Sequence, residues 1–502
     1  MGADLGDKEA IAVDHGTRPG WFRPFALAAG PLLGLTCYLW LGAETAMAHG
    51  GRATAAMAIW MALWWMTEAI PIFATAMLPL ALFPLLGIAD GRATAAPYAN
   101  PLIFLFLGGF VIAIATEKWG LHRRIALRAL RMVGNRADQV VGAFMLVSAF
   151  LSMWISNTAT AILMLPIALS IIHRSDTEEG HHAAVTEPAD RQFTLALLLG
   201  IAYGASVGGI GTLIGTPPNL FLASFARDQL GVHIGFAQWM AVALPLVLVL
   251  LSVIWLLLTR VLFNCVGYRL ADDAGLAEMP GSMNTGERWT LLVFVSAAGL
   301  WLTRPLLNQI EFSGHRPLAN LNDTGIAMLA AVVLFLLPAG DGRRVMDWDA
   351  MKRVPWGLLL LFGGGLTLAA AMQEQGVSDF LGQQLSDYHH LSPVLLVILA
   401  TSLMVFLTEL TSNTATTAAM VPIFAAVSEG VGLPPMLLAT AAAVSASCAF
   451  MLPVATPPNA IVFGSGHVGI RDMMRAGIWL NLICIVLVSA WVLLVLKHFL
   501  PD

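Results

Sequence analysis

Charged residues are so sparse along this chain that they divide it into long apolar runs. A helix that crosses a bilayer needs about 20 consecutive, mainly apolar residues. Runs of that order without Asp, Glu, Lys or Arg cover 24–43, 69–89, 93–116, 139–173, 192–226, 229–259, 354–373, 388–408, 430–470 and 476–496. Shorter runs cover 53–67, 289–303 and 324–340. Because the backbone in lipid must satisfy its own hydrogen bonds, such runs form helices. The sequence therefore predicts an all-α polytopic membrane protein with about 11 transmembrane helices.

The overall composition excludes several other classes of protein. Hydrophobic residues make up 58% of the 502 residues and charged residues 11%, whereas soluble domains carry about 25% charged residues. The net charge of −5 and the scattered basic residues argue against a nucleic-acid partner. The sequence contains neither a Walker A motif nor an HExxH motif, so we expect neither an ATP-driven pump nor an enzyme. Membrane lipid is the expected surrounding.

An internal repeat is the most informative pattern. The pentapeptide Ser156–Thr160 (SNTAT) recurs 256 residues later at Ser412–Thr416, and Thr216–Asn219 (TPPN) recurs 240 residues later at Thr456–Asn459. The difference between the two offsets matches the polar loop 174–191, which has no long counterpart in the second half. Apolar bias does not produce two polar motifs in the same order. The chain therefore consists of two related halves.

Basic residues predict how the two halves are oriented. The loop 117–137 carries six Lys or Arg residues, whereas the equivalent stretch 373–392 carries none. Cytoplasmic loops are enriched in Lys and Arg, so the two stretches are expected on opposite sides, as in an inverted-topology repeat. This places the N-terminus in the cytoplasm and the C-terminus outside an inner (plasma) membrane. The stretch 119–132 reads as an amphipathic helix on the cytoplasmic surface, with a solvated basic loop as the alternative.

Each half combines a polar hairpin tip with a broken helix. The charge-free run 139–173 has a Ser-Asn-Thr cluster near its middle, and each arm is short for a crossing. We therefore expect two re-entrant hairpins, at 137–173 and 392–428, that turn beside a wet cavity. Consecutive prolines break the paired helices 192–226 and 435–464. Broken helices at corresponding positions of two halves indicate a transporter binding site.

The uncharged tips suit a particular combination of ligands. Hydroxyl, amide and carbonyl oxygens are ligands for Na⁺, and Asn and Thr also donate hydrogen bonds to carboxylate oxygens. Two related tips fit a substrate with an anionic group at each end. Because the motifs contain no Lys or Arg, bound cations would offset the negative charge and so couple the two fluxes. The alternative is that Ser, Asn and Thr only cap buried half-helices.

The motifs themselves resemble a known family. FLSMWISNTAT, FLTELTSNTAT, GTLIGTPPN, LPVATPPN, WWMTEAIPI and APYANPLIFLFLGGF resemble the divalent anion/sodium symporters, from about residue 55 to the C-terminus. The resemblance implies a homodimer whose transport domain moves like an elevator against a scaffold domain. The expected parts are a cytoplasmic segment 1–23, scaffold helices 24–100, a first repeat core 101–265, a cytoplasmic linker 266–288, scaffold helices 289–373 and a second repeat core 374–502 that ends with a helix at 476–498.

The resemblance also implies the ligands of each site. The first sodium site would use Ser152, Ser156, Asn157 and Gly215, and the second Thr408, Thr411, Asn413 and Ala455. The substrate would meet Asn157, Thr158, Ser412, Asn413 and Thr414, with Thr216, Pro218, Thr456 and Pro457 nearby. The expected function is Na⁺-coupled import of C4 dicarboxylates such as succinate, fumarate or malate. A sodium-independent exchanger, or a carrier of citrate or sulfate, is the alternative.

Two acidic residues remain with two readings each. Glu68 lies between two apolar runs and is either functional or a structural residue at a helix end. Glu409 lies three residues before Ser412. It either tunes the second cation site or pairs locally.

Overall fold

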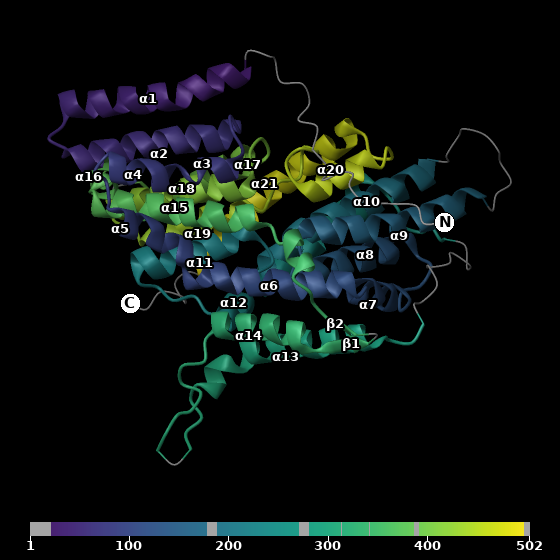
Figure 1. Ribbon diagram of the computed structural model, residues 1–502. Coiled ribbons are helices and arrows are strands. Elements are labelled where there is room, and N and C mark those ends of the chain that lie inside the picture. The colour runs from purple at the N-terminus through teal and green to yellow at the C-terminus, as the bar shows by residue number, and fades with distance from the viewer. Residues whose placement is uncertain are drawn as a thin grey trace.

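The computed structural model describes residues 22–177, 188–270, 281–312, 314–340, 342–385 and 391–495. The expected cytoplasmic segment 1–23 lies almost wholly outside these residues. The structure is a stack of long helices with one small two-stranded sheet, β1 (Pro338–Gly340) and β2 (Arg343–Arg344). Figure 1 shows most of the long helices running in roughly the same direction across the molecule.

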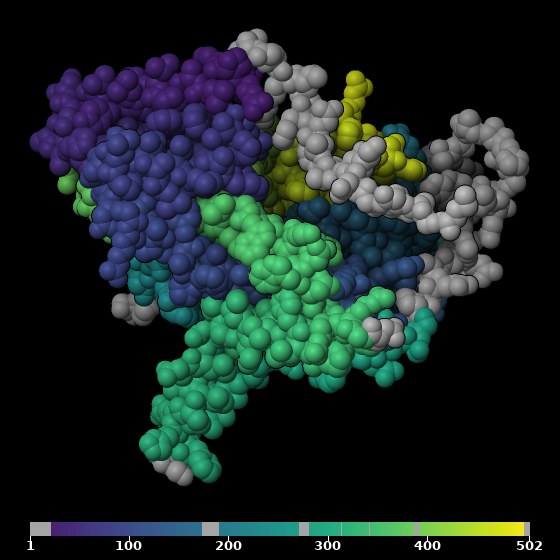
Figure 2. Space-filling model, viewed as in Figure 1, coloured from purple at the N-terminus to yellow at the C-terminus, as the bar shows by residue number. Residues whose placement is uncertain are grey.

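Several helical elements lie outside the two hairpins and the two interrupted helices. α1 (Phe22–Glu44) packs along α2 (His49–Thr67), and α14 (Asp323–Leu336) packs against both α6 (Pro101–Lys118) and α13 (Thr285–Leu307). The segment that joins α13 to α14 projects from the body of the molecule (Figures 1 and 2). Further helical elements in this part are α3 (Ile72–Thr75), α4 (Leu78–Leu85), α5 (Gly91–Ala95), η1 (Ala96–Ala99), α12 (Phe236–Leu256), η3 (Leu257–Leu262), η4 (Asp349–Arg353), α15 (Trp356–Glu374), α16 (Val377–Leu385) and α21 (Ile470–Val495).

Two helical hairpins carry the Ser-Asn-Thr motifs at their turns. The first consists of α8 (Ala137–Ser152) and α9 (Asn157–Thr177), and the second of α17 (Pro393–Thr408) and α18 (Asn413–Gly430). In both, four residues separate the helices, so the chain reverses over a short turn. Ser412 ends the second turn as the N-cap of α18, where its hydroxyl accepts a hydrogen bond from the amide of Ala415.

Two interrupted helices carry the Thr-Pro-Pro-Asn motifs. α10 (Pro188–Gly208) and a short η2 (Gly209–Gly211) precede α11 (Pro217–Leu230), while α19 (Pro435–Ser445) precedes α20 (Pro457–Gly464). The first proline of each motif is the first residue of the second helix, where a missing N–H costs nothing. The residues between the helices are unwound. Residues 212–216 of the first break are all buried, whereas in the second break residues 451–453 are half-buried and Val454 is exposed. The buried backbone groups need partners inside the protein.

Seven helices in the described part of the chain are long and apolar enough to cross a membrane. They include 91–118, 190–211, 236–262 and 470–495. Three of the four hairpin arms, at 137–152, 157–172 and 393–408, are among the shorter apolar helices of 10–17 residues. The mostly helical, apolar architecture is therefore confirmed, while the total of about 11 crossings stays a prediction.

The amphipathic stretch expected at 119–132 forms α7 (Leu121–Leu130). Its apolar side is buried on neighbouring protein, including α6 and α8, rather than left free. Arg124 is buried as well, because its guanidinium pairs with Glu287 at the start of α13 and donates to the carbonyl of Gly281. α7 is thus anchored to the helices around it.

Candidate functional site

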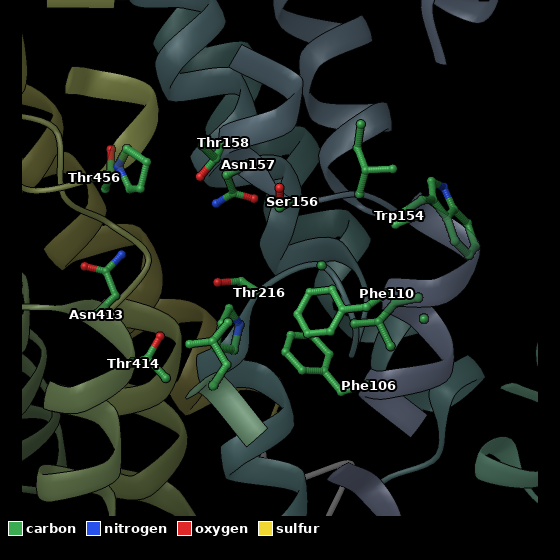
Figure 3. A pocket seen from close by; sticks show the side chains of 18 of the residues that line it. Phe106, Phe110, Trp154, Ser156, Asn157, Thr158, Thr216, Asn413, Thr414 and Thr456 are labelled. Carbon is green, nitrogen blue, oxygen red and sulfur yellow. The ribbon is translucent and has the colours of Figure 1, made fainter. Parts of the chain in front are cut away.

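A cavity of about 340 Å³ lies where the two hairpin tips and the two helix breaks meet. Figure 3 shows Asn157 and Thr158 on one side of it and Asn413 and Thr414 on another, with Thr216 between them. All residues lining it in the described part of the chain are uncharged: Phe106, Gly109, Phe110, Ala113, Trp154, Ile155, Ser156, Asn157, Thr158, Ile214, Gly215, Thr216, Pro217, Leu358, Ser412, Asn413, Thr414, Ala455, Thr456 and Pro457. Its volume falls in the range of small-molecule sites, roughly 300–1,000 Å³.

Four helices begin at this cavity. α9 and α18 begin with the lining residues Asn157 and Asn413, and α11 and α20 with Pro217 and Pro457. A helix N-terminus carries about half a positive charge. α9 and α18 also present backbone N–H groups in their first turn, whereas α11 and α20 each begin with two prolines, which have none. The backbone therefore makes the cavity attractive to an anion although no basic side chain is among its lining residues.

Each tip asparagine is joined to a hydroxyl at the end of the preceding helix. Thr408 donates to Oδ1 of Asn413 over 2.5 Å, and Ser152 donates to Oδ1 of Asn157 in the first half. Both hydroxyl residues are fully buried at the C-terminus of their helix. A hydroxyl and an amide oxygen so close together, at the negative end of a helix, provide two adjacent ligands for a hard cation.

The unwound segments are held by the asparagines of the Thr-Pro-Pro-Asn motifs. Nδ2 of Asn219 donates to the carbonyls of Gly209 (3.1 Å), Ile210 (3.1 Å) and Thr212 (2.8 Å). Nδ2 of Asn459 donates to the carbonyls of Ala449 (3.3 Å) and Leu452 (3.1 Å). These bonds satisfy buried backbone carbonyls that no helix ladder reaches. The role of the two asparagines was not among the sequence predictions, although both belong to a duplicated motif.

Most of the predicted site residues come together around the cavity. Eleven of them line it, namely Ser156, Asn157, Thr158, Gly215, Thr216, Ser412, Asn413, Thr414, Ala455, Thr456 and Pro457. Ser152 and Thr408 lie behind it, in contact with the tip asparagines. The hydroxyl of Thr411 bonds to the carbonyl of Leu407 and to Thr416 and does not line the cavity.

One residue differs from the expectation. Pro217 lines the cavity, whereas the predicted Pro218 is buried away from it. Pro217 is the first residue of α11, and the next residue is rotated by about 100° around a helix with 3.6 residues per turn. The pair Thr216–Pro217 thereby matches Thr456–Pro457 in the second half.

The capping alternative applies to the serines. The hydroxyl of Ser156 accepts from the amide of Ala159 over 3.1 Å, and Ser412 accepts from Ala415 over 3.5 Å. The asparagine side chains instead contact the preceding helix, as described above. The serines therefore cap the tip helices, and the Asn and Thr side chains provide the other polar groups of the cavity lining.

An aromatic wall was not foreseen from the sequence. Phe106, Phe110 and Trp154 line the cavity on the side away from Asn413 (Figure 3). Trp154, in the first hairpin turn, is stacked on Trp301 of α13 with ring centroids 6.5 Å apart and planes at 14°. In the sequence these residues cannot be told from ordinary core aromatics, since only the packing of α6 and α13 on the tip brings them here.

A second cavity, of about 570 Å³, continues along α9. It is lined by Ala159, Ile162, Leu163, Pro166, Ile167 and Ser170 of α9, and by Glu117, His122, Arg123 and Arg353 opposite. Arg353 pairs with Glu117, and burial lowers the pKa of His122 from its usual value. The residue before Ala159, Thr158, lines the first cavity, so α9 borders both.

Glu68 does not line either cavity. It ends α2 in the left-handed backbone region, at φ 50°. This position favours the structural reading of Glu68, because a helix commonly terminates through one left-handed residue.

Comparisons with known proteins agree over nearly the whole chain. The model of the family described as "Sodium:sulfate symporter transmembrane region" matches residues 34–497. The sodium-dependent dicarboxylate transporter SdcS of Staphylococcus saprophyticus is 41% identical over 470 residues, which is 92% of this chain and 89% of that protein. SdcS of Staphylococcus aureus strain USA300 is also 41% identical, over 484 residues, 95% of this chain and 91% of that protein.

Two solved structures share the fold at low sequence identity. The YdaH transporter of Alcanivorax borkumensis matches with a TM-score of 0.62 and 14% identity, covering 96% of this chain and 99% of that one. MtrF of Neisseria gonorrhoeae matches with a TM-score of 0.59 and 13% identity, covering 91% and 96%. These two likenesses concern the fold alone. The family match and the 41% identity confirm the resemblance drawn from the motifs: the chain belongs to the sodium:sulfate symporter family of membrane transporters.

Proposed function

We propose that this protein is a secondary-active symporter that moves C4 dicarboxylates such as succinate, fumarate or malate into the cell together with Na⁺. The observation that carries the proposal is the uncharged cavity at which four helices begin and both Ser-Asn-Thr tips meet. The name of the SdcS relatives, sodium-dependent dicarboxylate transporters, supports the same substrate and coupling ion.

The substrate's charge is matched by the helix ends. Four N-termini at about half a charge each contribute on the order of two positive charges. Asn157 and Thr158 lie on one side and Asn413 and Thr414 on another (Figure 3), so each carboxylate of a C4 dianion meets one tip. The amide and hydroxyl groups then donate to its oxygens. The dianion is thereby held at both ends.

In this proposal, sodium binds at the C-terminal end of the first helix of each hairpin. The Ser152–Asn157 and Thr408–Asn413 pairs lie where α8 and α17 end, and Gly215 and Ala455 contribute oxygens from the unwound segments. Thr408 also donates to the carbonyl of Ala446 over 3.0 Å, which links this pair to the break after α19. A bound cation attracts the dianion beside it, so each ligand strengthens the binding of the other.

We assign the moving and static parts from their packing. α20 packs on α9 and α10, and α11 on α18 and α19, so the hairpins and broken helices of both halves form one transport unit. α6 packs on α13 and α14, and we assign it to the scaffold with the helices of 24–100 and 289–373. The transport unit slides past this scaffold as an elevator, in a homodimer in the inner membrane with the N-terminus cytoplasmic.

The second cavity suggests which side is open. It leads along α9 towards Arg123, which lies in the loop 117–137 that the distribution of basic residues assigns to the cytoplasm. We infer that this structure represents the inward-open state, with α9 forming one wall of the path to the site.

The decisive experiment is uptake of radiolabelled succinate into proteoliposomes with and without an inward Na⁺ gradient. We expect accumulation that requires Na⁺ outside and no dicarboxylate inside. Uptake that ignores Na⁺ but requires internal dicarboxylate would establish exchange instead.

Sulfate is the second candidate, because the family model that matches the chain is named for sodium:sulfate symport. A sulfate ion is also a dianion, but it is too short to contact both tips at once. We therefore expect excess sulfate to inhibit succinate uptake far less than fumarate does. Equal inhibition would favour a sulfate carrier.

A further inference from the structure

We propose that Glu409 is a positioning residue that holds the second unwound segment through its backbone amides and makes the second cation site bind Na⁺ more tightly than the first. This inference rests on the proposed function. Glu409 follows Thr408 at the end of α17 and is 3% exposed. It does not line the substrate cavity.

The carboxylate of Glu409 accepts hydrogen bonds from three consecutive backbone amides. Oε1 accepts from the amides of Phe450 (2.7 Å) and Met451 (2.9 Å), and Oε2 accepts from Leu452 (3.0 Å). Oε1 also accepts from Nδ2 of Asn481 on α21, over 2.7 Å. Each of these bonds has the glutamate as acceptor, which is the arrangement that favours an ionised carboxylate.

The other side of the same peptides is held as well. Nδ2 of Asn459 donates to the carbonyls of Ala449 and Leu452, and the hydroxyl of Tyr203 donates to the carbonyl of Phe450 over 2.9 Å. The segment is thus fixed by Glu409 through its N–H groups and by Asn459 and Tyr203 through its carbonyls. Because the segment leads directly to Ala455 and Thr456 at the cavity, its position determines where the carbonyl ligands of the second site lie.

The first half lacks this carboxylate. The position equivalent to Glu409 by the 256-residue offset is Met153. There, the backbone carbonyl of Met153 accepts from the hydroxyl of Thr212 over 2.5 Å. The carbonyl side is alike in both halves, since Trp239 donates to Ile210 where Tyr203 donates to the equivalent Phe450. The two halves therefore differ in charge at the contact between the hairpin and the unwound segment.

This difference makes the two cation sites unequal. A buried negative charge one residue from Thr408 attracts a cation at the second site, and at low effective dielectric such an interaction changes affinity on the order of tenfold or more. The first site, near Ser152, has a methionine at the matching position. We therefore infer that Na⁺ enters the second site first when its concentration rises.

The test measures Na⁺ binding without substrate. Purified protein in detergent is titrated with NaCl at constant ionic strength, with choline as the replacing cation, and the thermal unfolding midpoint is recorded. We expect Glu409→Gln to raise the Na⁺ concentration for half-maximal stabilisation about tenfold or more, and Glu409→Asp, which keeps the charge, to lie between Gln and the wild type. The control is Glu429→Gln, an exposed carboxylate on α18, which should match the wild type.

The outcomes separate this inference from the proposed function. A wild-type protein that Na⁺ does not stabilise would contradict Na⁺ coupling itself. Normal stabilisation of the wild type with an unchanged midpoint in Glu409→Gln would overturn only the role of Glu409. If Glu409→Gln does not fold, Thr408→Ala and Ser152→Ala decide: loss of the tighter Na⁺ component in Thr408→Ala alone supports the inference, and equal effects overturn it.

Discussion

Asn219 and Asn459 hold the two unwound segments by the same pair of contacts. Each donates from Nδ2 to the carbonyls ten and seven residues before it in the chain. Both residues are completely buried. The 240-residue offset read from the sequence thus relates individual hydrogen bonds and not only residue names.

Asn219 and Asn459 each act as a clamp on an unwound segment, and replacing either one is expected to lower both stability and transport. Asn219→Ala or Asn459→Ala removes every hydrogen bond by which that side chain holds its segment, including the one to the Gly209 or Ala449 carbonyl, which we expect to lower the free energy of unfolding by about 2–4 kcal/mol. Thermal unfolding measures the loss and succinate uptake reports the displaced ligands. Asn308→Ala, which removes one 3.2 Å bond at a half-buried position, is the matched control and should cost about 1 kcal/mol. Equal effects at all three positions would contradict the clamp.

The tip asparagines should matter for transport and little for folding. Asn157→Ala and Asn413→Ala each remove a hydrogen bond to a carboxylate, worth about 1.5–3 kcal/mol, so uptake should fall at least about tenfold. The protein should remain monodisperse, with an unfolding midpoint near that of the wild type. Thr303→Ala, on an exposed turn of α13, should transport normally. Near-normal uptake in both asparagine variants would show that the tips only cap helices.

The hydroxyls behind the tips should act on the sodium requirement. Ser152→Ala and Thr408→Ala each delete one of two adjacent oxygens while leaving the cavity lining intact. We expect the Na⁺ concentration for half-maximal uptake to rise several-fold, with little change in the succinate KM measured at saturating Na⁺. The measurement is uptake over a grid of both concentrations. A changed anion preference with an unchanged Na⁺ requirement would reassign these hydroxyls to the substrate.

Uptake should depend on pH through the substrate rather than through the cavity. Among the described residues, those lining it have no ionisable side chain between pH 5 and 9. As the pH falls, succinate gains a proton and the fraction of dianion decreases, so uptake should fall in proportion and level off at high pH. Sulfate, which stays a dianion over this range, provides the control when its inhibition constant is measured and corrected for the succinate dianion present at each pH. If that inhibition rose and fell with pH, a titrating residue of the protein would be required.

The side on which the site opens can be tested by labelling. Ser170 lies on α9 in the second cavity, so Ser170→Cys in a background without Cys37, Cys265, Cys448 and Cys484 should react with a membrane-impermeant maleimide from the cytoplasmic side. Bound Na⁺ and succinate should change the rate if α9 borders the path. Val394→Cys, on the exposed face of α17, faces outward in the proposed topology and should not respond in the same way. Labelling of Ser170→Cys from outside would reverse the orientation.

The sequence was informative where polar residues interrupt apolar helices. The duplicated motifs identified eleven residues that line the cavity, because few forces other than ligand binding or capping keep such groups inside a membrane. The sequence did not predict that Phe106, Phe110 and Leu358 line the cavity. An apolar residue on an apolar helix has no feature in the sequence that shows which surface it packs against. Pro217 lines the cavity and Pro218 does not, because helix geometry points two adjacent prolines of a motif in different directions.

Glu409 illustrates the same limit for charge. Its position beside the motif marked it as unusual, but its partners are backbone amides 41 to 43 residues away and Asn481 on the last helix. Contacts with backbone amides cannot be recognised from the residue types in a sequence. The sequence left open whether Glu409 pairs locally or influences the cation site. In our proposal it does both.

The four helix ends at the cavity also have a consequence for how specificity changes over evolution. At α9 and α18 the attraction originates in backbone N–H groups and survives almost any single side-chain replacement, because every residue except proline keeps its N–H group. Mutations at Thr158, Thr414 or Leu358 can then reshape the space around the anion without abolishing its capture. A scaffold of this kind can switch from one dianion to another in small steps, each of which still leaves a working carrier.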